Sequence, residues 1–150
     1  MAVDGRIVGA IDHGLVALIG VTHTDSAADA TALADKTAAL RVFPNGGLDF
    51  DRTVVEIGGG VLCVSQFTLY GDVRRGNRPS WRAAARPDPA REVIESYVSR
   101  LRSLGVEVAT GVFGADMLVA LDNDGPVTLV LDSAALAHPR RDPSGMPGDD

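Results

Sequence analysis

The chain has 150 residues, of which 45% are hydrophobic, and its formal net charge is −6. This length fits one domain with a real core, and the charge argues against broad, non-specific binding of nucleic acid. Cys63 is the only cysteine, which excludes a disulfide framework, and no apolar run is long enough to cross a bilayer. Residues 1–5 lack the pattern of a secretory signal, so we expect a cytoplasmic protein that is not bound to a membrane.

The N-terminal third predicts two strands followed by a helix. Residues 6–11 and 14–21 read as strands joined by a turn, and the second is so continuously apolar that we expect it to be buried on both faces. Thr24 or Asp25 can cap a helix that runs to about Arg41 with an apolar stripe facing the core.

The middle of the chain predicts a hairpin, a buried strand and a long loop. Pro44 and the residues after it form a strong turn signal, which predicts a short strand pair around residues 44–47. Residues 61–68 predict a second buried strand. The polar stretch 70–87 is long enough for its length alone to suggest a functional loop.

Basic residues concentrate in this loop. Between residues 73 and 91 lie six of the 14 Lys and Arg residues, with Asp88 as the only acid. Such a local basic loop on an acidic protein can hold a phosphodiester backbone, or it can simply be solvated. The six are Arg74, Arg75, Arg78, Arg82, Arg86 and Arg91.

The C-terminal half predicts one more helix and three strands. Asp88 is a good cap with Pro89 at the first helical position, and Gly105 is a stop signal. Strands are expected at 106–110, 116–121 and 127–131. The whole order predicts a single α+β domain over residues 1–133, with mixed sheet or barrel-like layers and two main helices, followed by a disordered polar tail at 134–150.

The usual catalytic groups are sparse. Each of His13, His23 and His138 is predicted at a turn, before a helix or in the tail, and nothing in the sequence brings one to Ser65 to form a triad. Clusters with metal-ligand spacing and glycine-rich phosphate loops are also missing, so we expect neither a metal nor a cofactor.

Main-chain chemistry remains possible at two places. Backbone N–H groups near Phe67 and Thr68, at the end of a predicted strand, could stabilise an oxyanion, although polar residues there can also serve only the strand end. Gly125 and Pro126 could present two carbonyl groups to an ammonium group if their peptide bond were cis, or they could be an ordinary strand connection.

Four motifs, in this order and spacing, resemble the D-aminoacyl-tRNA deacylase family across roughly residues 3–133. They are Ser65-Gln66-Phe67-Thr68-Leu69, Arg78-Pro79-Ser80, Gly111-Val112-Phe113-Gly114-Ala115-Asp116-Met117 and Asn123-Asp124-Gly125-Pro126-Val127-Thr128. The resemblance implies a homodimer with active sites at the subunit interface. It also implies hydrolysis of D-aminoacyl-tRNA, and of glycine mischarged on tRNA, to the free amino acid and tRNA.

The resemblance also implies roles for individual residues. Gln66, Phe67 and Thr68, beside Ser65, would hold the scissile ester, and the 2′-hydroxyl of the terminal adenosine would replace a protein nucleophile. Gly125 and Pro126 would form a Gly-cis-Pro pair that reaches into the partner's site and rejects L-amino acids. The remaining expected contacts are Phe113 and Met117 near the terminal adenosine, and Arg74, Arg75 and Arg78 on the tRNA.

One departure from the family pattern leaves other functions open. Family members usually begin with one more strand before the segment that matches residues 3–5, and we expect its lack to expose a sheet edge. The alternatives are a related editing deacylase for another misacylated tRNA, in which a trans Gly-Pro bond relaxes chiral selection, and a non-catalytic dimer that binds tRNA ends.

Overall fold

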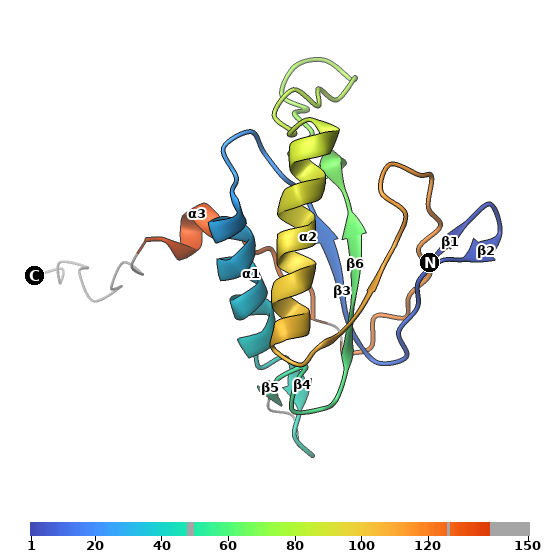
Figure 1. The fold of residues 1–150 in the computed structure, drawn as a ribbon, viewed down its shortest axis with the longest axis vertical. Helices are drawn as coiled ribbons and strands as arrows, with labels where there is room; N and C mark the ends of the chain where they lie inside the picture. The colour runs from blue at the N-terminus through green and yellow to red at the C-terminus, as the bar shows by residue number, and fades with distance from the viewer. Residues whose placement is uncertain (48–49, 126, 139–150) are drawn as a thin grey trace, which may run out of the picture.

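The computed structural model describes residues 1–47, 50–125 and 127–138. Its centre is a three-stranded parallel sheet in the order β3-β6-β7, formed by Gly14–Ile19, Gly60–Ser65 and Glu107–Thr110. The helices α1 (Ala27–Ala39) and α2 (Pro87–Ser103) lie side by side against one face of this sheet (Figure 1). This arrangement confirms the α+β class and the two main helices.

Two small antiparallel pairs flank the central sheet. At the N-terminus β1 (Ala2–Val3) pairs with β2 (Arg6–Ile7), and β4 (Phe43–Pro44) pairs with β5 (Phe50–Arg52). The predicted strand pair around residues 44–47 is therefore confirmed. A short helix, α3 (Ser133–Leu136), begins at the predicted boundary between the domain and the tail, and residues 139–150 lie outside the described residues.

The prediction of barrel-like layers is wrong for the part of the chain that the structure describes. No closed barrel forms there, because the two predicted strands at 116–121 and 127–131 do not pair into ladders. Leu118 makes a single bridge to Ala2, with both N–H to O=C distances at 2.9 Å. The apolar pattern indicated an extended backbone correctly, but a strand also needs a neighbour to which it can hydrogen-bond.

The burial of the central strands follows their position in the sheet. The middle strand β6 is buried from Gly60 to Val64, as predicted for that segment, and ends at Ser65 instead of Thr68. The prediction that residues 14–21 are buried on both faces is wrong. The strand β3 is an edge strand of this sheet, and Leu18 is exposed.

Alternate residues of β6 face two different clusters, as the period of two in a strand requires. Val61 and Cys63 join the larger cluster under α1 and α2, which includes the fully buried Leu101. Leu62 and Val64 join a smaller cluster on the opposite face with Met1. Met117 and Val119, from the C-terminal segment, pack on this second cluster. Four side chains of the same segment are exposed and are here called the outer apolar set: Leu118, Leu121, Leu129 and Val130.

Both helices begin at residues other than the predicted ones. Ser26 is the N-cap of α1, and its N–H and hydroxyl both donate to Asp29 Oδ2, at 2.9 and 2.7 Å. Asp25 instead accepts the N–H of Thr22. The helix α2 begins at Pro87, because a proline in the first turn loses no helical hydrogen bond.

The C-terminal end of α2 and the contacts between α1 and α2 are also well defined. The stop signal at Gly105 is confirmed by its φ of 81°, which favours glycine, and by its N–H, which donates to Arg102 O. Arg100 Nε on α2 donates to Asp35 Oδ1 on α1 at 2.6 Å. In the core between the helices, the hydroxyl groups of Thr37 and Tyr97 are 2.9 Å apart.

Candidate active site

The predicted catalytic residues lie where β6 ends and the chain turns into a short 3-10 helix, η1 (Phe67–Tyr70). The N–H of Gln66 donates to Ile19 O at 2.7 Å, which fixes this turn to the end of β3. The first N–H groups of a helical turn have no intrahelical acceptor, so those of Phe67 and Thr68 belong to the free end of η1. Leu69 is the first residue whose N–H donates back, to Gln66 O.

Polar side chains organise this turn. The side-chain amide of Gln66 donates to the hydroxyl oxygen of Thr68, and both residues are partly buried. Ser65 is the last residue of β6, and Phe67 is exposed. The four residues therefore present one polar edge with free backbone N–H groups and an aromatic ring, which is an arrangement that can hold a carbonyl group.

The adjoining strand carries Phe113 toward the same edge. Cys63 of β6 is paired in register with Thr110 of β7, and because the strands are parallel, the residues after both leave the sheet at the same edge. Phe113 lies three residues beyond Thr110. Its ring faces the first turn of α2, where the guanidinium carbon of Arg91 is 4.9 Å from the ring centroid.

Met117 lies away from this edge, against the second face of the sheet. Its side chain packs on the small cluster that contains Leu62 and Val64. Gly111 makes this packing possible, because a Cβ there would overlap the sulfur atoms of Met117 and Met1. Met117 also lines a hollow of about 390 Å³ beside the turn at Asp4.

The turn at Gly125 is exposed and separate from the other predicted residues. Apart from its chain neighbours, a Cβ placed on Gly125 would have only Val127 within 4 Å among the described residues, and the φ of Gly125 is 152°, a conformation that residues with side chains rarely adopt. Asn123 Nδ2 donates to Thr128 Oγ1 across the turn at 3.1 Å. Pro126 lies outside the described residues, so the prediction of a cis bond between Gly125 and Pro126 falls outside them too.

The three predicted tRNA-contacting arginines are all exposed, but they differ in their surroundings. Arg74 donates from Nε and Nη2 to the two carboxylate oxygens of Asp72, at 2.8 and 2.7 Å. These hydrogen bonds hold the pKa of Asp72 well below its usual range. Arg75 and Arg78 lie further along the same loop.

Two residues that were not predicted contact the candidate site. Trp81 stacks edge-to-face with Phe67, with ring centroids 5.6 Å apart, and Arg91 covers Phe113. The sequence held a signal for Trp81, because the only tryptophan of the chain stands within the arginine-rich stretch. Arg91 was counted in the basic stretch 73–91, but its contact with Phe113 was not predicted, since that contact depends on where the start of α2 lies against the end of β7.

Of the histidines, His13 lies too far from Ser65 to complete a triad with it. His13 precedes the start of β3, whereas Ser65 is paired with Ile19 at its far end, so the two are separated by the length of the strand, roughly 17 Å. His23 Nε2 bonds to Arg82 O at 2.8 Å. Burial raises the pKa of Cys63 to about 12, which leaves its thiol protonated at neutral pH.

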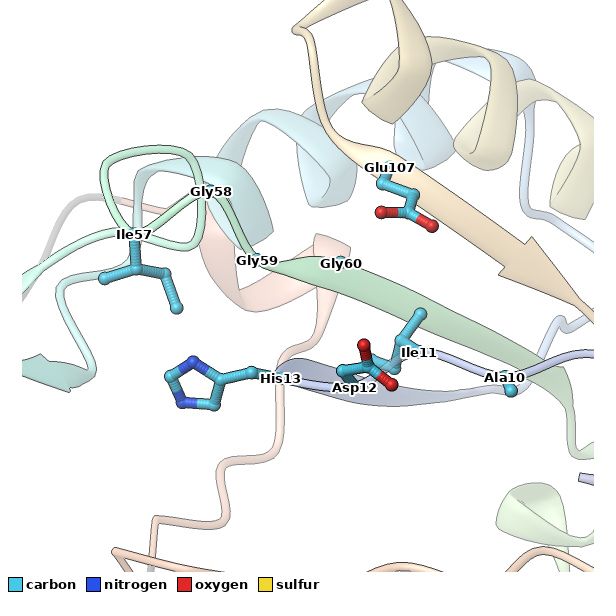
Figure 2. A pocket seen from close by; sticks show the side chains of 9 residues that line it. All are labelled: Ala10, Ile11, Asp12, His13, Ile57, Gly58, Gly59, Gly60 and Glu107. Atoms are coloured by element: carbon cyan, nitrogen blue, oxygen red, sulfur yellow. The ribbon is translucent and has the colours of Figure 1, made fainter.

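A hollow of about 260 Å³ lies at the opposite edge of the sheet from the predicted site (Figure 2). The carboxylates of Asp12 and Glu107 and the ring of His13 stand around it, beside the glycines that precede β6. It contains none of the predicted site residues. Across the described parts of the chain, no group of three His, Cys, Asp or Glu side chains could hold a metal ion, and no helix is long and apolar enough to cross a membrane.

Comparisons with known proteins cover the stretch of chain that holds this site. Residues 1–132 match the family described as D-Tyr-tRNA(Tyr) deacylase. Proteins named D-aminoacyl-tRNA deacylase are 53% identical in Chloroflexus aurantiacus, covering 94% of this chain and 88% of that protein, and 54% identical in Rhodopirellula baltica, covering 88% and 91%. A third, from Thermus aquaticus, is 54% identical and covers 89% of this chain and 88% of its own.

A solved structure shares the fold as well. The c-Myc DNA Unwinding Element Binding Protein superposes with a TM-score of 0.80 at 33% identity, covering 87% of this chain and 89% of that one. The family match thus extends over nearly the whole described chain, and the relatives are more than 50% identical to it over the aligned residues. The chain therefore belongs to the D-Tyr-tRNA(Tyr) deacylase family, as its four motifs predicted, and is a hydrolase.

Proposed function

We propose that this chain hydrolyses the ester bond of D-aminoacyl-tRNA and releases the free D-amino acid and intact tRNA. The observation that carries the proposal is the match of residues 1–132 to the deacylase family, together with relatives of that name at more than 50% identity. Glycine mischarged on tRNA is a second substrate, because glycine has no side chain for a chirality-reading site to reject.

The ester carbonyl would lie against the free end of η1. Water attacks the carbonyl carbon, and the N–H groups of Phe67 and Thr68 stabilise the oxyanion that forms. The tetrahedral intermediate then breaks its bond to the ribose oxygen, which leaves with a proton from the attacking water. The 2′-hydroxyl of the terminal adenosine assists in place of a protein nucleophile, which is supported by the distance of His13 from Ser65.

Chirality would be read by Gly125 and Pro126, contributed by the partner subunit. Their carbonyl groups engage the ammonium group of the substrate, and an L side chain collides with the pair. Support comes from the exposure of Gly125 and the open space around it: beyond its chain neighbours, only Val127 among the described residues lies within 4 Å of a Cβ placed there. A turn of this kind is free to enter the site of a second copy.

A homodimer is supported by the outer apolar set. Val130 is 95% exposed and Leu118 73% exposed, so both side chains meet water in a single chain. Apolar side chains gathered on one layer are typical of a surface that another protein covers. A second copy would bury this layer and bring each Gly125 turn toward the other site.

The first test is release of tyrosine from D-tyrosyl-tRNA and from L-tyrosyl-tRNA. We expect rapid release from the D ester and little from the L ester. Thr68→Ala should slow the reaction, whereas Thr31→Ala, which removes a hydroxyl that donates to Ala27 O within α1, is a matched control that should not. Hydrolysis of both esters at similar rates would favour a related editing deacylase, and binding of charged tRNA without turnover would favour a non-catalytic tRNA-end-binding protein.

A further inference from the structure

The loop between η1 and α2, residues 71–86, is held firmly and is here called the arginine loop. Asp72 and Ser80 exchange two backbone hydrogen bonds, at 2.8 and 2.9 Å, which close its outer part. Thr22 Oγ1 donates to Ala83 O at 2.6 Å, and the N–H of Ala85 donates to Val21 O at 2.8 Å. The backbone is therefore hydrogen-bonded on both sides of Trp81: within the loop before it, and to Val21 and Thr22 after it.

The side chain of Trp81 extends from this loop to the turn at residues 65–68. Its ring meets the ring of Phe67 at an angle of 77°, and a Cβ on Gly71 would come within 2.5 Å of its Cζ3 atom. Gly71 thus allows the indole to rest directly on the backbone that follows η1. Although two of its sides are occupied, 41% of Trp81 is exposed.

The loop that carries Trp81 also carries five exposed arginines. Asp72 is the acid of the loop, and its charge is taken up by Arg74. A basic surface combined with exposed aromatic rings is the usual way in which proteins bind unpaired nucleotides, with cations on the phosphates and rings on the bases. The exposed arginines are Arg74, Arg75, Arg78, Arg82 and Arg86.

We propose that Trp81 stacks on an unpaired base of the tRNA 3′ end, with Phe67 supporting its ring and the arginine loop holding the adjoining phosphates. The proposal rests on the deacylase function proposed above, since it places the RNA end beside the turn that holds the ester. Trp81 would then be a binding residue that positions the acceptor end, and it would take no part in the chemistry.

The only tryptophan of the chain reports on this contact directly. Titration with an uncharged RNA hairpin that ends in an unpaired CCA sequence should quench the fluorescence of Trp81 in a saturable way. The same hairpin with a blunt end should bind more weakly and leave the fluorescence nearly unchanged. Equal quenching by both hairpins would overturn the proposal.

Variants test the stacking contact in a second way. Trp81→Ala should weaken binding of the CCA hairpin between about 5-fold and about 150-fold, and Trp81→Phe should restore most of the affinity because a ring remains. Phe50→Ala, on β5, is a matched control: its ring is 46% exposed and lies on the β4–β5 pair at the other end of the molecule (Figure 1). Unchanged affinity in Trp81→Ala, with native circular dichroism, would overturn the proposal.

Kinetics separate this proposal from the proposed function. With D-tyrosyl-tRNA, Trp81→Ala should raise KM by a factor similar to the loss in affinity for the hairpin. If the wild type hydrolyses the ester and Trp81→Ala leaves KM unchanged, the stacking contact fails while the function stands. If the wild type binds the CCA hairpin with quenching but hydrolyses nothing, the deacylase function fails while the contact stands.

Discussion

The two faces of the β3-β6-β7 sheet are covered in different ways. One carries α1 and α2 over a continuous core in which Leu101 and Val61 are fully buried. The other is covered by extended chain over a cluster of three buried residues, and the outer apolar set of that chain is exposed. The apolar side chains of the first face are therefore buried within one chain, whereas apolar side chains beside the second face stay exposed to water.

This difference explains why the site residues are distributed as they are. The turn at 65–68 directly follows β6, a strand that is packed on both of its faces, and the N–H of Gln66 bonds to β3. The turn is therefore formed in the single chain. Met117 packs on the cluster of the second face, and the Gly125 turn follows further along the same C-terminal segment. The chain therefore forms the turn proposed to bind the ester alone, and under the proposed function we expect it to need a second copy for chiral selection.

The largest expected effect is the loss of packing on the helix-covered face. Leu101→Ala removes a fully buried side chain and should lower the free energy of unfolding by about 2–5 kcal/mol. Leu118→Ala on the other face should lower it by less than about 1 kcal/mol in dilute protein, because the side chain is already in water. Urea denaturation of both variants measures the contrast, and equal losses would show that the two faces are equally complete.

The next effect concerns the exposed layer. Val130→Asp places a charge where we expect the second copy and should weaken self-association about 10- to 100-fold, as analytical ultracentrifugation would measure. Val55→Asp is the matched control, because Val55 is also exposed but lies in the turn before β6. A chain that is monomeric at every concentration, or equal weakening by both changes, would contradict the dimer proposed for this face.

Alkaline pH should weaken the helix-covered face. Burial raises the pKa of Cys63 to about 12 and that of Tyr97 to about 12, both in the core under the helices. The unfolded chain releases these protons at a lower pH than the folded chain, so stability is full below about pH 9 and falls as the pH rises from there toward 12. The loss should be about 1 kcal/mol between pH 9 and pH 10.

Denaturation curves at several pH values measure this decline. Tyr97→Phe removes one of the two groups and should flatten the part of the decline above pH 10 relative to the wild type. A stability that stays level from pH 8 to pH 11 would mean that neither group stays protonated in the folded chain. The prediction therefore tests whether the first face is as tightly closed as its buried residues indicate.

The sequence predicted the first face better than the second. Apolar residues at helical spacing identified α1 and α2, because a helix satisfies its own hydrogen bonds and its pattern is local. The segments at 116–121 and 127–131 carry an equally clear apolar pattern, yet they form no ladder, since pairing depends on a neighbour that the pattern cannot specify. Leu18 shows the same limit, because an edge strand and a central strand can have the same apolar sequence.

For the site, the motifs predicted a turn at the end of a strand, which the structure has at residues 65–68, but contacts between distant segments were beyond them. The turn at 65–68 follows from the end of one strand and is therefore local in sequence. Trp81 reaches Phe67 only because Val21 and Thr22 hold the arginine loop against the sheet edge. Likewise, the pairing of Arg74 with Asp72 changes what an arginine-rich sequence offers to a phosphate, and only the structure reveals it.

The ion pair between Arg74 and Asp72, in the arginine loop, gives the smallest predicted effect. Asp72→Asn keeps an oxygen for the N–H of Arg74 but removes the charge that the guanidinium now neutralises, so affinity for the CCA hairpin should rise roughly twofold and its salt dependence should steepen by up to about one unit of slope. Asp51→Asn makes the same charge change in the pair with Arg41, near β5. Asp51 lies far from the arginine loop, so Asp51→Asn should leave the affinity for the hairpin nearly unchanged. Fluorescence anisotropy across a salt series measures both variants. An equal rise in affinity in both would mean that only the net charge of the protein matters.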